Sequence, residues 1–197
     1  MAKRAFDVII ALFIAPVAAL VAGIMALVLA IELRGNPFFV QERIGLNGTP
    51  FRMYKLRTMR HPAPGEQRCY RIDDWSSFVF NPPGEEDPRV TRAGAFARKL
   101  SLDEIPNLIN VLRGEMSLVG PRPEIPEIVA QYPEAYHRRH SVLPGVAGPA
   151  QVNGRSDLPY DEILQYDLAY VDHHSVLTDI QVLAKTALVV LSGSGAR

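Results

Sequence analysis

The chain has 197 residues, a length that suits about one domain, and its formal charge at pH 7 is zero, with 21 basic and 21 acidic side chains. A zero net charge argues against a protein whose overall field attracts nucleic acid, so no nucleic-acid partner is expected. Cys69 is the single cysteine, which excludes an internal disulfide and a cysteine-rich metal site.

The first element is an uncharged run from Val8 to Ile31, which is long enough to cross a bilayer at about 20 residues per span. Pro16 lies inside this run, where it removes a backbone donor and predicts a kink. Lys3 and Arg4 precede the run and Arg34 follows it, whereas a spanning helix carries its excess of basic residues on the cytoplasmic side only. The run is either a spanning helix or, as the charges favour, a broken helix that returns to the same face. Lys3 and Arg4 are then expected among anionic head groups.

A β-hairpin and a long loop are expected next. The stretch FFVQERIGLNGTPFRMYKLRTM carries Asn47-Gly48 between two flanks that bear aromatic residues, which predicts a hairpin. Residues 61–88 contain five prolines and two glycines, and they predict a loop with a short helix around Arg68–Ser77.

Residues Leu100–Leu112 are apolar at helical spacing and predict a helix. Ser101 and Glu104 form the S-x-x-E pattern of a capping box, but Pro106 would then fall at the fifth helical position and cost a hydrogen bond. With Asp103 as the N-cap, Pro106 falls at the third position, where no N–H is needed. We favour this second register, with a kink at Pro106 as the alternative. Three more helices are expected, over Glu124–His140 with an interruption at Pro133, over Asp161–Tyr170 and over Thr178–Leu191.

Asp103 and Glu104 are the candidates for chemistry. A helix N-terminus stabilises negative charge and also attracts phosphate oxygens. An aspartate there could act as a nucleophile on a phosphoanhydride, forming an acyl-phosphate, while Glu104 could help hold a divalent cation or accept a proton. Taken alone, the pair is explained more simply as a helix cap and a solvated side chain.

Two further stretches suit an anionic ligand. Arg122 stands between two prolines in SLVGPRP, which fixes the backbone around a residue suited to bidentate phosphate contact. The stretch PGVAGPAQVNGR, from Pro144 to Arg155, is a Gly- and Pro-rich loop that could approach a ligand closely. Basic side chains also cluster, and each cluster alone is simply a solvated surface. The clusters are Arg52, Lys55, Arg57 and Arg60; Arg89, Arg92, Arg98 and Lys99; and Arg138, Arg139, His140 and Arg155.

Four stretches in order make the chain resemble the bacterial sugar transferases, the monotopic phosphoglycosyl transferases that begin glycoconjugate assembly. These are GNPFFVQERIG, FRMYKLRTM, DPRVTRAGAFARKLSLDEIPNLINVLRGEMSLVGPRP and PGVAGPAQVNGR. The resemblance covers nearly all of residues 1–190 and is most specific in the SLDE and SLVGPRP block. It matches the small form of the family, without extra N-terminal membrane helices. We therefore expect an α-dominated α+β fold, with a re-entrant membrane helix over 1–36 broken at Pro16, a cytosolic catalytic domain of helices and a small β-hairpin over 37–191, and a disordered tail over 192–197.

The resemblance implies an activity in polysaccharide biosynthesis at the cytosolic face of the bacterial cytoplasmic membrane. Members transfer a phosphosugar from a UDP-sugar to polyprenyl phosphate and release UMP. Asp103 matches the family's nucleophile and Glu104 its dyad partner, and both are expected at a required Mg²⁺ ion. Arg98 and Arg122 carry over as phosphate contacts. The nucleotide contacts are expected at Gln151, Asn153, Gly154 and Arg155.

The chain departs from the family pattern at two places. The family breaks its membrane helix at a Ser-Pro pair, which is Ala15-Pro16 here. Where the family often reads PGITGWAQVNGR, this chain has Ala147 and Pro149, so an aromatic residue that could stack on the base is missing.

Two alternatives stay open at this point. One is a membrane-anchored scaffold or lipid-binding protein of the same fold with a decayed active site, which Pro149 favours. The other is direct transfer with Asp103 as a metal ligand only. The sequence also leaves open which sugar is used and whether the protein forms a homodimer.

Overall fold

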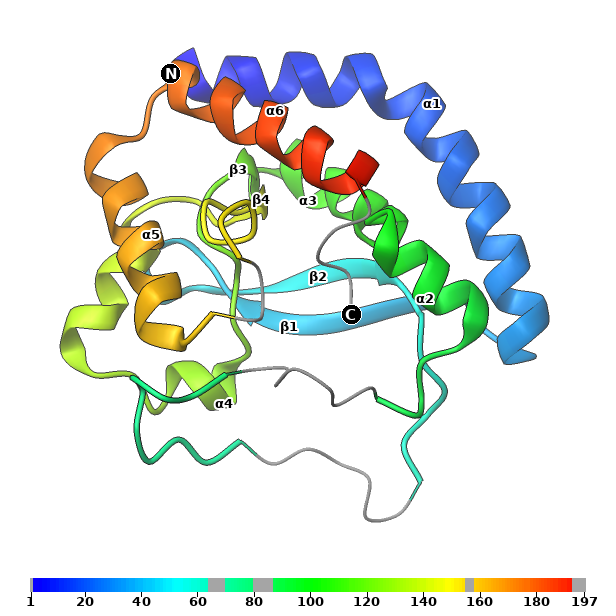
Figure 1. Cartoon of the computed structure of the whole chain (residues 1–197). Coiled ribbons are helices and arrows are strands. Elements are labelled where there is room, and N and C mark those ends of the chain that lie inside the picture. The colour runs from blue at the N-terminus through cyan, green and yellow to red at the C-terminus, as the bar shows by residue number, and fades with distance from the viewer. Residues whose placement is uncertain (1, 64–69, 80–86, 155–157, 193–197) are drawn as a thin grey trace.

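The computed structural model describes residues 2–63, 70–79, 87–154 and 158–192, and helices dominate these residues alongside two small two-stranded sheets (Figure 1). Arg155 and most of the expected tail, residues 193–197, lie outside the described residues. The coarse fold prediction, helix-dominated with a small β-hairpin and one long apolar N-terminal helix, is confirmed.

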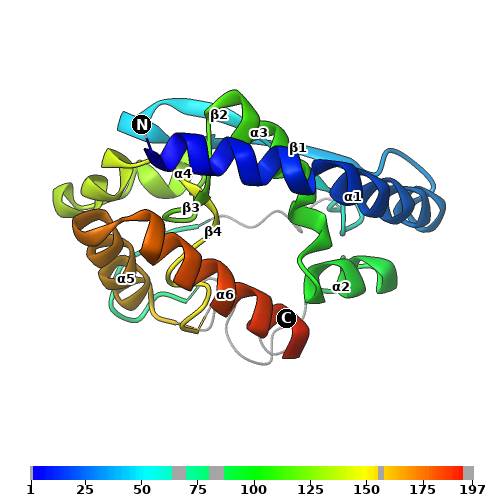
Figure 2. The ribbon, with the colours of Figure 1, turned by 90° about the horizontal axis from the view of Figure 1, so that it is seen from above.

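Helix α1 (Ala2–Leu33) arches over the rest of the molecule and changes direction along its course (Figures 1 and 2). The helix is continuous through Pro16, so the predicted break is wrong. An interior proline costs one backbone hydrogen bond, and the helix accommodates that loss by bending rather than by ending. Among the described residues, α1 is the one helix that is long and apolar enough to cross a membrane.

The N-terminal end of α1 is attached to the protein by polar side chains. Asp7 is buried, and its carboxylate accepts from the Ser117 hydroxyl at 2.8 Å and the Leu118 amide at 3.1 Å. Lys3 donates to the carboxylate of Asp179 at 2.6 Å, and Arg4 donates to the carbonyl of Leu112 at 2.9 Å. Lys3 and Arg4 were expected among head groups, but both side chains turn toward the protein and fix the helix.

The predicted hairpin is confirmed. Strands β1 (Phe38–Ile44) and β2 (Pro50–Leu56) pair antiparallel and are joined by the short 3₁₀ segment η1 (Leu46–Gly48). Asn47 and Gly48 adopt φ values of 53° and 75°, the left-handed conformation that these residue types tolerate best.

Helix α2 (Arg92–Lys99) follows the long loop and was not predicted. The Thr91 hydroxyl caps it by accepting from the Gly94 amide at 3.0 Å. A Cβ on Gly94 would lie 2.1 Å from the Thr58 carbonyl oxygen, so only glycine lets α2 approach the chain just after β2.

The segment that carries Asp103 does not follow the favoured register, because Ser101 rather than Asp103 precedes its first helical residue, and it is closer to the alternative with an irregularity at Pro106. It forms the 3₁₀ helix η2 (Leu102–Asn107), and the regular helix α3 (Leu108–Arg113) begins only after Pro106. Ser101 occupies the cap position, but with φ of 53° its side chain does not cap. The capping box fails because the Glu104 carboxylate is bound elsewhere, by Lys55 and Arg122.

The sequence did not predict a second sheet. Strands β3 (Ser117–Val119) and β4 (Gly145–Ala147) pair in parallel. A Cβ on Gly120, just after β3, would lie 2.4 Å from the Leu143 carbonyl oxygen, so the close approach of these two segments requires glycine.

The helix expected over Glu124–His140 is indeed interrupted at Pro133, but its pieces are short. They are α4 (Pro126–Val129) and the 3₁₀ helix η3 (Glu134–Ser141).

The last two helices are confirmed as α5 (Tyr160–His173) and α6 (Val176–Ser192). The short helix expected around Arg68–Ser77 is wrong in its described part, residues 70–77, which contains only a turn at 75–77; Arg68 lies outside the described residues. Trp75 instead packs against the rings of Tyr136 and Tyr160, with centroids 5.2 and 5.0 Å apart.

Replacing Asp7 by Asn should destabilise the protein by about 1–3 kcal/mol, because one of two buried donors then loses its acceptor. Chemical unfolding in detergent micelles measures this difference. Asp73→Asn is the matched control, since that side chain is 82% exposed, and it should change the unfolding free energy by less than about 0.5 kcal/mol. Equal effects of the two changes would contradict the docking role of Asp7.

His140 should make the stability depend on pH. Burial, with added repulsion from Arg139 and His137, lowers the pKa of His140 to about 4. The unfolded chain takes up this proton near pH 6.5, so stability is full above that pH and falls as the pH drops from about 6.5 to about 4. In His140→Phe, the unfolding free energy should depend less steeply on pH in this window. His173→Phe, at an exposed position, should keep the parent slope.

Candidate active site

Glu104 is the point at which three distant segments meet. Its Oε1 atom accepts from the Lys55 ammonium at 2.9 Å and from Nη2 of Arg122 at 2.7 Å. Lys55 lies on β2, Glu104 on η2, and Arg122 in the loop that follows β3. The structure therefore brings together two residues predicted for the site, Glu104 and Arg122, with Lys55, which the sequence placed only in a basic cluster.

The charges around Glu104 keep it ionised. Burial alone would raise the pKa of the Glu104 carboxyl, but the charges of Arg122 and Lys55 and their hydrogen bonds outweigh burial and hold the pKa well below its usual range. The Glu104 carboxylate in turn raises the pKa of Arg122. Glu104 is therefore a fixed negative charge that positions two cations, rather than a base poised to take up a proton.

Asp103 differs from its neighbour. Within the described residues its carboxylate makes no hydrogen bond, although three cations lie near it. Burial, followed by repulsion from Glu104, raises the pKa of Asp103, while Lys55, Arg98 and Arg122 oppose that rise. An aspartate with uncommitted oxygens beside several cations can attack a phosphorus atom or ligate a metal ion.

Arg98 is held at the end of α2. Its Nε donates to the Thr58 hydroxyl at 2.9 Å and its Nη2 to the sulfur of Met59, also at 2.9 Å. Burial lowers the pKa of the Arg98 guanidinium. These bonds use two of five N–H donors, so donors remain for a phosphate. The sequence predicted Arg98, but it gave no signal for the support from Thr58.

Two arginines, the buried Arg139 and the partly buried Arg43, hold the loop that carries Arg122. Arg139 donates to the carbonyl of Arg122 at 2.8 Å, and Arg43 donates to the carbonyl of Pro123 at 3.0 Å. The Glu124 carboxylate lies 3.7 Å from Arg43 and 4.0 Å from Arg139. Prolines fix the local backbone of this loop, and the arginines fix its position relative to β1 and η3. The only sequence signal for Arg139 was its place in a basic cluster.

The predicted nucleotide residues lie in the loop after β4. Because β3 and β4 are parallel, this loop and the Arg122 loop leave the same edge of the sheet. Gln151 accepts from the Gly148 amide at 2.6 Å, and Asn153 donates to the Pro149 carbonyl at 2.8 Å. In the described part of the chain these side chains therefore brace their own loop, and no hydrogen bond or ion pair joins it to Glu104. Gly154 is exposed beside them.

A magnesium ion is compatible with these residues only if substrate completes its ligands. No group of three or more His, Cys, Asp or Glu side chains suited to a metal occurs among the described residues. Mg²⁺ is commonly bound by one or two carboxylates together with substrate phosphates, and Asp103 and Glu104 offer that number.

Comparison with known proteins identifies one family for this chain. A family model described as "Bacterial sugar transferase" matches residues 1–193. The chain is 35% identical over 193 residues to the uncharacterized sugar transferase EpsL of Bacillus subtilis, covering 98% of this chain and 89% of EpsL.

Two longer relatives match as well. The galactosyl transferase CpsE of Streptococcus agalactiae is 38% identical over 202 residues, which is 100% of this chain and 44% of CpsE. The undecaprenyl-phosphate glucose phosphotransferase of Komagataeibacter xylinus is 39% identical over 202 residues, covering 93% of this chain and 35% of that protein. The chain thus spans less than half the length of these two relatives.

Replacing Arg139 by Met should lower the unfolding free energy by about 3–5 kcal/mol, because buried Asp167 loses the cation that it accepts from at 2.5 Å. The double change Arg139→Met with Asp167→Leu should recover part of this loss. Chemical unfolding of both single variants and the double variant measures the coupling. Additive effects would show that Arg139 and Asp167 do not stabilise each other.

Proposed function

Because this chain belongs to the bacterial sugar transferase family, we propose that it transfers a phosphosugar from a UDP-sugar to a polyprenyl phosphate, releasing UMP and forming a polyprenyl diphosphate sugar. The proposal rests on the environment of Asp103: its carboxylate has no hydrogen-bond partner in the described residues, and the charges of Lys55, Arg98 and Arg122 act on it. The name of the Komagataeibacter relative, which refers to undecaprenyl phosphate and glucose, supports the choice of substrates.

The reaction proceeds in two displacements. A carboxylate oxygen of Asp103 attacks the β-phosphorus of the UDP-sugar, the bond between this phosphorus and the oxygen bridging to the α-phosphate breaks, and UMP leaves with the electron pair. A phosphate oxygen of polyprenyl phosphate then attacks the same phosphorus. This second step breaks the bond to Asp103, restores its carboxylate and forms the diphosphate product.

The surrounding residues stabilise charge. Arg98 and Arg122 contact the phosphoryl oxygens on which charge accumulates, and their fixed positions avoid reorganisation during the reaction. Glu104 holds Arg122 and Lys55 in place for this task. Asp103 and Glu104 would hold Mg²⁺ together with the substrate phosphates, and the ion would offset charge on the diphosphate and on the leaving UMP.

The nucleotide half of the donor binds at the loop after β4. Gln151 and Asn153 brace the described part of this loop, which ends at Gly154. Arg155, also proposed as a nucleotide contact, lies outside the described residues. Its position at the same sheet edge as the Arg122 loop supports this placement.

The protein acts at the cytosolic face of the bacterial cytoplasmic membrane, as a monotopic protein whose helix α1 enters one leaflet and returns. Side chains on α1 expose a large apolar surface to the lipid; among them are Ile9, Leu12, Phe13, Val17, Leu20, Leu27 and Ile31. Both ends of α1 contact the same folded unit, through Lys3 at one end and through Glu32, which accepts from the Arg92 and Ala93 amides at 2.9 Å, at the other. A spanning helix would place its ends on opposite sides of a hydrocarbon core about 30 Å thick, so this contact pattern favours return to one face.

The test is release of UMP from a panel of UDP-sugars without lipid acceptor, in detergent or in vesicles that contain anionic phospholipid. The parent protein should release up to one UMP per active site, and Asp103→Asn should abolish this burst. Asp73→Asn, a surface change, is the control and should keep it. An undiminished burst from Asp103→Asn would exclude the covalent step, and tight binding of polyprenyl phosphate without turnover on any sugar would favour a binding protein instead.

A further inference from the structure

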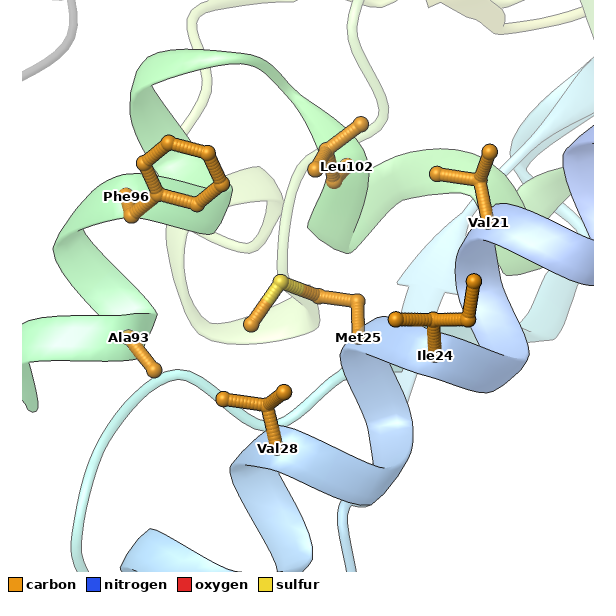
Figure 3. Close-up of a pocket in the computed structure, with 7 residues that line it drawn as sticks. All are labelled: Val21, Ile24, Met25, Val28, Ala93, Phe96 and Leu102. Carbon is orange, nitrogen blue, oxygen red and sulfur yellow. The ribbon is translucent and has the colours of Figure 1, made fainter.

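An apolar pocket of about 410 Å³ lies between α1, α2 and η2 (Figure 3). All seven residues that line it are apolar. They are Val21, Ile24, Met25 and Val28 from α1, Ala93 and Phe96 from α2, and Leu102 from η2. Figure 3 shows these side chains converging from the three elements, with Met25 between the two helices. Met25 is buried, whereas Ile24 and Phe96 are more than half exposed, so the pocket has a closed floor and an open rim.

The pocket and the candidate active site share neighbouring residues of η2. Leu102, which lines the pocket, directly precedes Asp103 on η2. In a 3₁₀ helix successive side chains are turned by about 120°, so one turn presents Leu102 to the apolar pocket and Glu104 to Lys55 and Arg122. One turn of chain therefore separates an apolar site from a cationic one.

An apolar pocket next to a cationic site suits an amphiphile that carries a phosphate at one end. The phosphate of such a molecule would be attracted by Lys55, Arg98 and Arg122 around Asp103. Its chain must leave the site along an apolar path, because burying apolar surface is favourable and exposing it is not. The wall formed by α1 continues into exposed apolar residues such as Leu20 and Leu27, which offer the chain a route to the bilayer.

We propose that this pocket binds the isoprenoid units of polyprenyl phosphate closest to its phosphate, and so holds the acceptor for attack at Asp103. The inference rests on the proposed function and adds the place where the acceptor chain binds. Ala93 and Phe96 on α2 and Met25 on α1 form the walls around the chain. Glu32 fixes the width of the pocket, because it ties the end of α1 to the start of α2.

The experiment fills the pocket and measures the two half-reactions separately. Ala93→Phe places a ring in the pocket, and Ala95→Phe makes the same change at an exposed position of α2 that does not line it. For Ala93→Phe, the KM for undecaprenyl phosphate should rise about tenfold, equivalent to about 1.4 kcal/mol. The UMP burst without acceptor should stay at the parent level. Ala95→Phe should match the parent in both measurements.

Val28→Trp, at a half-exposed position on the pocket rim, is a second filling variant in case Ala93→Phe does not fold. A short acceptor with one isoprene unit should show no difference between filled and parent pockets, since it has little chain to displace. An unchanged KM in both filling variants, or an equal loss of the UMP burst and of transfer, would overturn the inference. Photocrosslinking of the pocket to phospholipid but not to a photoreactive polyprenyl phosphate would also overturn it. A parent protein that releases no UMP would instead reject the proposed function itself.

Discussion

The ion pairs of Glu104 with Lys55 and Arg122 are the interaction on which the candidate site depends. A buried carboxylate is costly unless cations and hydrogen bonds compensate it, and here two cations from two other segments do so. The requirement fixes η2 against β2 and against the loop after β3. The same ion pairs explain why the Glu104 side chain does not form the capping box that the sequence pattern predicts. Asp103, one residue earlier, is left with uncommitted oxygens beside the same cations. The same ion pairs therefore fix the position of η2 and place the cations beside the free oxygens of Asp103.

The sequence predicted those features that depend on neighbouring residues. The hairpin followed from Asn47-Gly48, and α5 and α6 followed from their periodicity, because turn conformation and helix periodicity are local properties. The register of η2 and α3 could not be predicted, since the partners of Glu104 lie 49 and 18 residues away. The parallel pair of β3 and β4 has only three residues per strand and is equally non-local. Arg43 and Arg139 act through backbone carbonyls of the Arg122 loop, which leaves no pattern in the sequence. The roles of Asp103, Arg98 and Arg122 came from resemblance to a family, and spacing alone would not have assigned them.

Helix α1 connects the surface proposed to enter the membrane with the candidate site. Its first turns are bound by polar contacts, through the buried Asp7 to β3 and through Lys3 to α6, and its last turn caps α2 through Glu32. Between these attachments the helix exposes apolar side chains on one side and lines the apolar pocket beside Leu102 on the other. A helix that is continuous through Pro16 but bent can satisfy both attachments at once. The same element that would seat the protein in lipid thus also shapes the surface next to Asp103.

The proposed mechanism requires that Asp103 becomes covalently attached to the phosphosugar. The most direct measurement is mass spectrometry of the protein quenched in acid after reaction with the UDP-sugar in the absence of lipid acceptor. One added phosphosugar per chain is expected, located by peptide fragmentation at Asp103 and lost when polyprenyl phosphate is added before the quench. A protein that turns over its substrates with both present, yet never carries the added mass or carries it on another residue, would contradict the account.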